Sequence, residues 1–239
     1  MEEAVLIDGV RSPIGKYGGG LSKTRPDDLL AYVYRGLIDR IGLDPGELDE
    51  VFAGCGNQAG EDNRDVARMS ALLAGFPKEI PGVTINRNCS SALSAVNLSA
   101  RSIISGEGHL YIGSGVESMS RAPWSIPKPE KTPTTAAPRV YDTTVGWRYE
   151  NPRLDQKFPI ISLGQGAELI ANEMQISRVE QDEFSLESHK RAVQAINDGK
   201  FQSEIIPITV EGRREKSDEI KLDEHPRYEK SGSKFKLAI

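Results

Sequence analysis

The chain has few of the residues on which several protein classes depend. Only two cysteines, Cys55 and Cys89, occur in 239 residues, which excludes a disulfide framework and makes a reducing cytoplasm the simplest compartment. The three histidines are scattered and no Cys/His cluster has metal-ligand spacing, so no structural metal is expected. Apolar runs are too short to span a bilayer, and residues 1–20 lack the basic-then-apolar pattern of a signal peptide.

Positive charge is also in deficit. The chain has 30 Lys and Arg against 35 Asp and Glu, a net charge of −5, which argues against nucleic acid or a membrane surface as a partner. Apolar residues at 38% and charged residues at 27% are typical of a folded globular protein. The length allows one large domain or two small ones.

Residues 1–118 alternate between strand and helix patterns. Strand-like runs cover Ala4–Val10, Val51–Gly56, Gly82–Asn88 and Leu110–Val116, and helical patterns begin at Pro26, Val66 and Ser90. This alternation predicts an α/β fold with a mostly parallel sheet covered by helices on both faces. The helix over Ser90–Ser105 carries a single charge, Arg101, so we expect it to be buried on most sides.

The composition changes after Ser120. Five prolines between residues 123 and 138 indicate a crossing loop. Two helices are expected beyond it, the first over Gly166–Gln175. The second begins at Ser177, where Ser177 and Glu180 have capping-box spacing, and a strand is expected near residues 204–210. We therefore predict two domains, residues 1–120 and 121–239.

Cys89 lies between a predicted strand and a predicted helix. The start of a helix presents unpaired N–H groups and a partial positive charge, which lower the pKa of a nearby thiol. The thiolate is the form that attacks carbonyl carbon, and the carboxyl ends of parallel strands are where such sheets bind ligands. The alternative role is that of a small buried hydrophobic residue, which we assign to Cys55.

Several segments resemble the thiolases, the acetyl-CoA C-acyltransferases or 3-ketoacyl-CoA thiolases. They follow one another in the family's order at residues 8–15, 60–68, 85–93, 115–120 and 142–148, the last being most similar to the β-ketoadipyl-CoA thiolase branch. The resemblance implies that Cys89 carries the acyl group as a thioester during acyl transfer between a 3-ketoacyl-CoA and CoA, in thiolysis or in the reverse Claisen condensation. Acyl-CoA and CoA are then substrates, and no further cofactor is implied.

The resemblance also implies an architecture. In thiolases two similar halves stack sheet against sheet, and an α+β loop domain that covers CoA is inserted in the first half. Residues 1–120 then correspond to the N-terminal α/β domain without its last strand and helix, and residues 121–239 to the loop domain. By this correspondence the C-terminal half is expected to be absent, and the family's Gly-His-Pro, Cys-x-Gly and Asn-Glu-Ala-Phe motifs do not occur in these 239 residues. We expect the 239-residue chain alone to be inactive, and a homo-oligomer or a complementing C-terminal thiolase half to be its protein partner.

Three residues are implied in CoA binding by the same resemblance. Arg227 matches a loop-domain arginine that packs against the CoA nucleotide. Ser162 and Leu163 occupy the place of the family's His-Met pair at the pantetheine channel, with both side chains different.

Two other interpretations stay open. One is a truncated or split subunit without catalytic activity. The other is a ketoacyl-synthase-like condensing enzyme, because the run Cys89-Ser90-Ser91 also suits that group. The segments at residues 60–68 and 116–120 count against the second interpretation.

Overall fold

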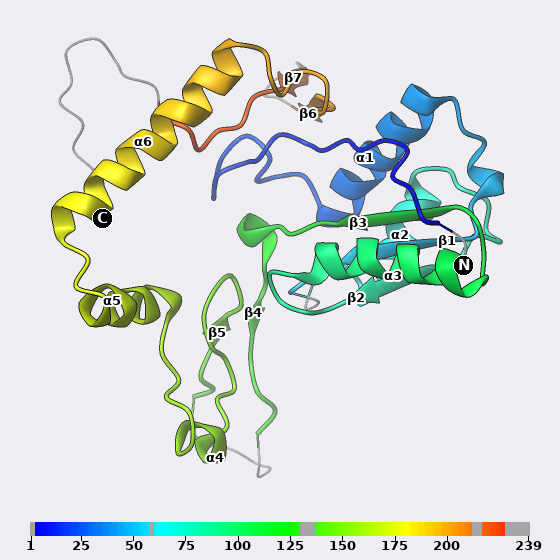
Figure 1. Cartoon of the computed structure of the whole chain (residues 1–239). Helices are drawn as coiled ribbons and strands as arrows, with labels where there is room; N and C mark the ends of the chain where they lie inside the picture. Colours follow the sequence, from blue (N-terminus) through cyan, green and yellow to red (C-terminus); the bar gives the residue numbers. More distant parts are fainter. Residues whose placement is uncertain (1–2, 58–59, 130–136, 212–216, 228–239) are drawn as a thin grey trace.

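The computed structural model describes residues 3–57, 60–129, 137–211 and 217–227. A sheet of three parallel strands lies at its centre (Figure 1). The strands are β1 (Glu50–Gly54), β2 (Gly82–Ile85) and β3 (Tyr111–Gly115), in the spatial order β2-β1-β3. Val51 of β1 pairs with Gly82 on one side and with Ile112 on the other. The predicted α/β fold with a parallel sheet is therefore confirmed.

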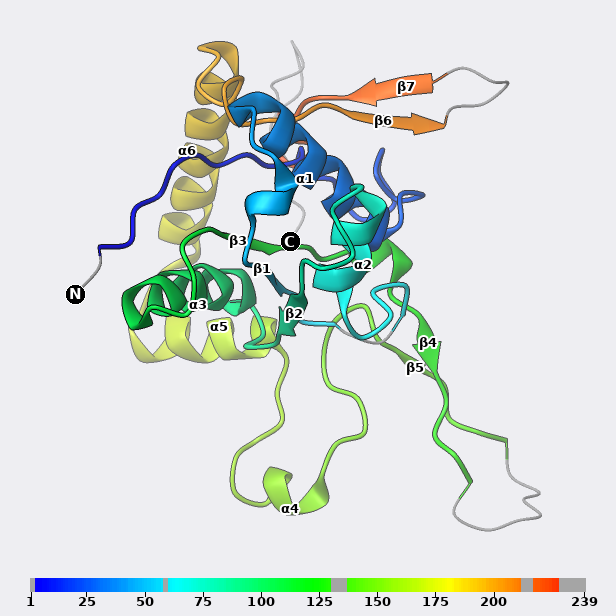
Figure 2. The ribbon, with the colours of Figure 1, turned by 90° about the vertical axis from the view of Figure 1, so that its right-hand side faces the viewer.

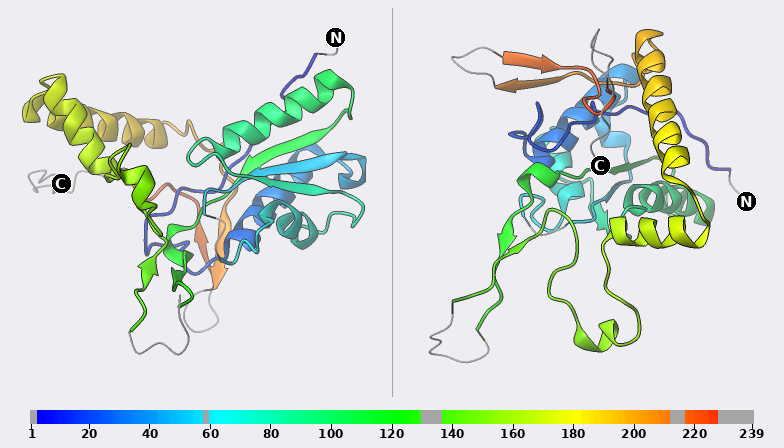
Figure 3. Two further views of the ribbon diagram at one scale, coloured as in Figure 1. Left: turned by 90° about the horizontal axis from the view of Figure 1, so that it is seen from below. Right: turned by 90° about the vertical axis from the view of Figure 1, so that its left-hand side faces the viewer.

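Helices cover both faces of this sheet. Two of them, α1 (Pro26–Ile41) and α2 (Val66–Leu73), lie on one face, and α3 (Ser91–Ser105) lies on the other (Figure 3). The central strand is consequently covered on both sides, and Val51 and Ala53 have no exposed surface. A core cluster joins β1 to the inner faces of α1 and α2.

Helix α1 begins and ends where its sequence predicts. Pro26 stands at its first position and Asp27 lies in its first turn, both of which are favourable at a helix start. Gly42 ends it with a φ of 65°, the left-handed conformation that glycine adopts without strain. Tyr34 is buried on the inner face, and its hydroxyl lies 2.7 Å from the hydroxyl of Ser114 on β3. This bond fixes α1 against the sheet.

Helix α3 is buried on one face only. Its small buried residues Ser94, Ala95, Ser99 and Ser102 face the sheet. On the remaining surface Leu93 is 63% exposed. The expectation of burial on most sides is therefore wrong for this chain, because the described residues cover α3 from the sheet side alone.

The predicted first strand is also wrong. Residues 4–10 are extended but form no strand, and Leu6 is 86% exposed. They run alongside β3, an edge strand (Figure 1), and a cavity of about 990 Å³ is lined by both. Its apolar walls come from α1 and α3 and include Val33, Leu37, Val96 and Ile103. A strand needs a hydrogen-bonded neighbour, and the cavity separates this segment from β3.

The chain after β3 forms separate small elements. They are the 3-10 turn η2 (Met119–Arg121), the short strands β4 (Trp124–Ser125) and β5 (Tyr141–Asp142), the helices α4 (Pro152–Asp155), α5 (Leu163–Glu173) and α6 (Arg178–Asn197), and the hairpin of β6 (Ile208–Glu211) and β7 (Ser217–Ile220). A further 3-10 turn, η1 (Pro45–Glu47), lies earlier in the chain, between α1 and β1. The capping box of Ser177 and Glu180 is confirmed. A second capping box, of Ser162 and Gln165, starts α5 earlier than predicted.

We call the chain after β3 the second part; its residues 204–223 pack against the part that precedes it. Arg11 pairs with Ile205 in an isolated parallel bridge, and its side chain forms ion pairs with Glu204 and Asp223. Ile208 is fully buried against the beginning of α1, next to which the β6–β7 hairpin lies (Figure 2). The boundary at residue 120 remains a prediction. Among the described residues, no helix is long and apolar enough to cross a membrane.

We predict that Gly54→Ala destabilises the fold by about 2–3 kcal/mol. A Cβ at Gly54 would overlap the backbone of Ser91 and Ala92, because α3 begins directly on this strand end. The control is Gly9→Ala, where a Cβ meets nothing within 4 Å and the expected change is below about 0.5 kcal/mol. Urea unfolding followed by circular dichroism measures both. Equal midpoints for the two variants would contradict the close packing of α3 on β1.

Candidate active site

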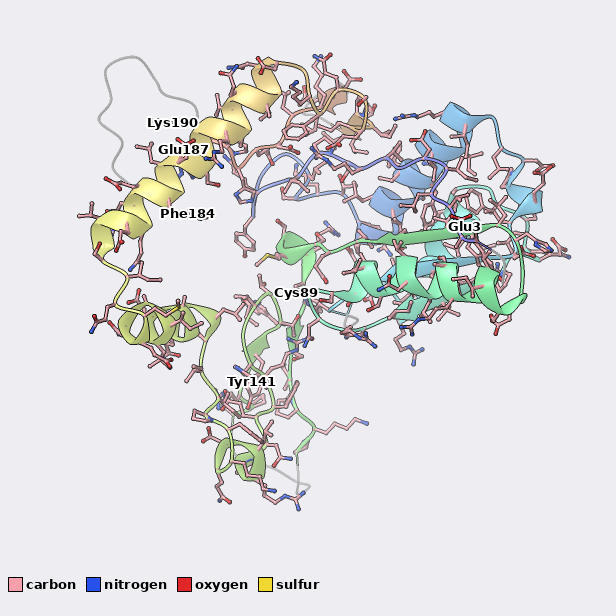
Figure 4. All side chains as sticks on the ribbon, in the orientation of Figure 1. Glu3, Cys89, Tyr141, Phe184, Glu187 and Lys190 are labelled. Carbon is pink, nitrogen blue, oxygen red and sulfur yellow. The ribbon has the colours of Figure 1, made fainter. Side chains whose placement is uncertain are left out.

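Cys89 lies in the turn between β2 and α3, at the carboxyl end of the sheet. It is exposed, and α3 begins two residues later at Ser91. Figure 4 places it beside the first turn of α3. The predicted position at a strand-to-helix junction is thus confirmed, whereas the chemical role of Cys89 stays a prediction.

Hydrogen bonds within the turn fix its backbone. The Asn88 carbonyl accepts bonds from the Ser91 backbone N–H at 3.1 Å and from the Ser91 hydroxyl at 2.6 Å. The Ser91 Oγ in turn accepts the N–H of Arg87 at 2.8 Å. Asn88 has a φ of 50°, and its N–H donates to the Asn86 side chain at 2.9 Å. Asparagine tolerates this left-handed conformation better than most residues do, so the residues before Cys89 suit the turn.

Glu117, just beyond β3, connects the carboxyl ends of β1 and β3 to the turn of Cys89, which follows β2. Its carboxylate accepts the N–H of Gly56 at 2.8 Å and that of Asn57 at 3.3 Å. The carbonyl of Gly56 then accepts the Asn86 side chain at 2.9 Å. A Cβ at Gly56 would lie 3.7 Å from the Asn88 carbonyl oxygen. The carboxyl ends of β1, β2 and β3 thus meet beside Cys89.

A segment of the second part closes this network. The side-chain amide of Asn57 donates to the Thr143 carbonyl at 2.9 Å, and its oxygen accepts a bond from Arg148 at 3.1 Å. The indole of Trp147 donates to the Ile161 carbonyl at 3.0 Å. Residues 142–148 therefore link the turn of Cys89 to the start of α5.

The two thiols have opposite environments. Cys55 is buried in the core cluster at the end of β1, which confirms its assignment to core packing. Burial first, and then the negative charge of Glu117, raise the pKa of the Cys55 thiol to about 12. Cys55 is therefore protonated at neutral pH and Cys89 is the accessible thiol.

The predicted CoA-binding residues belong to the part of the chain that follows β3. Ser162 caps α5 with its hydroxyl, and Leu163 is 83% exposed at the first position of that helix. Arg227 is exposed, and its backbone N–H donates to His189 of α6 at 3.3 Å. Among the described residues, no hydrogen bond or ion pair joins any of the three to Cys89. Their role in CoA binding is not tested by these positions and stays a prediction.

Sequence reasoning missed Asn57 and Arg148 as site residues. Both lie in or next to segments that resemble thiolase sequences, but neither has a local signal that indicates contact with the other. The described residues contain no group of three or more His, Cys, Asp or Glu side chains that could hold a metal ion.

Comparison with known proteins identifies the family. Residues 4–238 match the profile of the thiolase N-terminal domain. The chain belongs to the thiolase family. This membership favours thiolase over the ketoacyl-synthase alternative.

Several thiolases are similar to this member over nearly its whole length. A β-ketoadipyl-CoA thiolase of Pseudomonas aeruginosa is 47% identical over 227 residues, which are 94% of this chain and 56% of the relative. The 3-oxoadipyl-CoA/3-oxo-5,6-dehydrosuberyl-CoA thiolase of Escherichia coli is 46% identical over 96% of this chain and 57% of its own length. The crystal structure of the Bacillus anthracis acetyl-CoA acetyltransferase superposes with a TM-score of 0.85 at 35% identity, covering 95% of this chain and 56% of that one. The chain thus spans about half the length of the relatives it matches.

We predict that Glu117→Gln makes Cys55 react faster with iodoacetamide at pH 9, by several-fold. Loss of the negative charge favours the Cys55 thiolate and lowers its pKa, although burial keeps that pKa above the usual range. Mass spectrometry of the two cysteine peptides gives each rate. Glu117→Asp is the matched control, since it keeps the charge while weakening the hydrogen bonds. Equal acceleration in both variants would instead indicate opening of the loop.

Proposed function

We propose that this chain supplies the acyl-accepting half of a thiolase. The observation that supports it most is the exposed thiol of Cys89, held in a hydrogen-bonded turn where the carboxyl ends of three parallel strands meet. Ligands of open α/β sheets bind at this edge. Membership of the thiolase family supplies the reaction class, which is acyl transfer through a thioester.

In the proposed reaction the Cys89 thiolate attacks the 3-keto carbonyl carbon of a 3-ketoacyl-CoA. The bond between carbons 2 and 3 breaks, and acetyl-CoA leaves with the electron pair and takes up a proton. The shortened acyl group stays on the sulfur as a thioester. The thiolate of a second CoA then attacks this thioester, which releases the new acyl-CoA and restores the Cys89 thiolate. Run in reverse, the same steps form a carbon–carbon bond.

Each attack places negative charge on a carbonyl oxygen, which needs preorganised donors. The N–H groups of Ser90 and Ser91 already donate to the Arg87 and Asn88 carbonyls. The donors that the start of α3 offers are therefore the N–H groups of the next residues, Ala92 and Leu93, because Ser90 makes no side-chain capping bond to them. We propose that these N–H groups contribute to that stabilisation.

The names of two similar proteins support a proposal for the substrate class. The Pseudomonas and Escherichia relatives are named for β-ketoadipyl-CoA and for 3-oxoadipyl-CoA and 3-oxo-5,6-dehydrosuberyl-CoA. Adipic and suberic acids are dicarboxylic, so their CoA monothioesters keep a carboxylate at the far end of the acyl chain. We propose 3-oxo dicarboxylic acyl-CoA thioesters as the substrates here. With 3-oxoadipyl-CoA, the group carried by Cys89 is succinyl.

We further propose that turnover needs the remainder of a thiolase. The chain covers 56% of the Pseudomonas relative, and its sequence lacks the Gly-His-Pro and Cys-x-Gly motifs. The exposed side of α3 and the apolar cavity beside β3 are surfaces that such a remainder would cover. A non-catalytic subunit remains the second candidate, favoured by the exposure of these same surfaces.

We predict that the 239-residue chain alone does not cleave 3-oxoadipyl-CoA. Fusion to the C-terminal part of the Pseudomonas relative should give thiolysis, measured by loss of the 3-oxoacyl-CoA absorbance on adding CoA. Cys89→Ala should abolish the activity of the fusion, and Cys55→Ala should keep most of it because Cys55 packs in the core. Activity that survives Cys89→Ala would overturn the nucleophile assignment. A folded but inactive fusion would support the non-catalytic subunit.

A further inference from the structure

Arg148 brings a positive charge to the loop beside Cys89. Its side chain is half-buried, and its Nη2 donates to the side-chain oxygen of Asn57 at 3.1 Å. Other arginines of the fold, such as Arg11 and Arg121, bind carboxylates. Among the described residues Arg148 forms no ion pair, so the partner it contacts is a neutral amide.

Asn57 is held so that its oxygen faces Arg148. Its backbone N–H donates to Glu117, and its side-chain nitrogen donates to the Thr143 carbonyl at 2.9 Å. The Glu117 carboxylate, the acidic group of this network, is directed at the backbone N–H groups of Gly56 and Asn57. A guanidinium has five N–H donors, and this contact uses one of them. The remaining donors are enough for a bidentate pair with a carboxylate.

The attachment point of Arg148 is close to the thiol along the network. Gly56, the neighbour of Asn57, binds the Asn86 side chain with its carbonyl oxygen. A Cβ at Gly56 would also lie 3.7 Å from the carbonyl oxygen of Asn88, the residue before Cys89. Arg148 is thus two residues of the network away from the turn that carries the sulfur.

We propose that Arg148 binds the distal carboxylate of the acyl group that Cys89 carries, and so selects dicarboxylic over simple fatty acyl chains. This assignment rests on the proposed function of Cys89. An acyl carboxylate that enters the site loses water and needs a paired cation. Arginine matches a carboxylate with two parallel hydrogen bonds. A neutral acyl chain offers nothing to these donors, and selection follows from that difference.

The experiment compares anionic and neutral alkylating agents on the 239-residue chain at low salt. Iodoacetate and 3-iodopropionate are each paired with their amides, and the rate at Cys89 is read by mass spectrometry of its peptide. The anion-to-amide rate ratio reports the local positive charge, independently of the reactivity of the thiol. We expect Arg148→Met to lower this ratio about fivefold while leaving the amide rates unchanged. Added salt should shrink the difference.

Matched variants make the result specific. Arg148→Lys keeps the charge and should stay close to the original ratio, whereas Arg153→Met removes a charge from α4 and should change nothing. An unchanged ratio in Arg148→Met overturns the assignment, and so does a drop that occurs in Arg87→Met instead. The proposed function fails separately, if Cys89 of the unmodified chain reacts no faster with the amides at neutral pH than a short cysteine peptide does.

Discussion

The carboxylate of Glu117 holds together the ends of the three parallel strands. Strand ends leave backbone N–H groups without a ladder partner, and this side chain accepts two of them, from Gly56 and Asn57. Bonds to an ionised acceptor are stronger than those between neutral groups. Through the carbonyl of Gly56 the same support reaches Asn86 and hence the turn of Cys89. The candidate site is therefore built from the carboxyl ends of three strands rather than from a single loop.

The same carboxylate separates the chemistry of the two thiols. Its oxygen lies 4.0 Å from the Cys55 sulfur, and its charge adds to burial in raising the pKa of that thiol. Cys89 lies in the exposed turn that Glu117 supports only through intermediate residues. The Glu117 side chain can thus both stabilise the candidate site and keep the Cys55 thiol protonated.

Local signals predicted what is locally determined. Pro26 and the capping box at Ser177 mark true helix starts, and the junction at Cys89 is where the sequence indicates. The box of Ser162 has the same spacing and would have corrected the start of α5. These features need only neighbouring residues, so the sequence is sufficient for them.

Features that depend on distant partners were not predictable in this way. Residues 4–10 have a strand pattern, yet no strand forms because the neighbouring position beside β3 is a cavity. The bond between Arg148 and Asn57 joins residues 91 positions apart and leaves no periodic trace. The apolar residues of α3 likewise indicate that the helix can be buried by a partner on its exposed side. They do not indicate which partner that is.

The cavity between β3 and the extended N-terminal segment has a consequence for how the protein is handled. An edge strand with apolar walls is a template for any extended peptide of suitable length, including one from a neighbouring copy. At high protein concentration, a segment from a second copy of the chain competes for the position beside β3. Pairing between copies therefore increases with protein concentration. Dilution, or co-expression with a polypeptide that packs in the cavity beside β3, favours correct assembly.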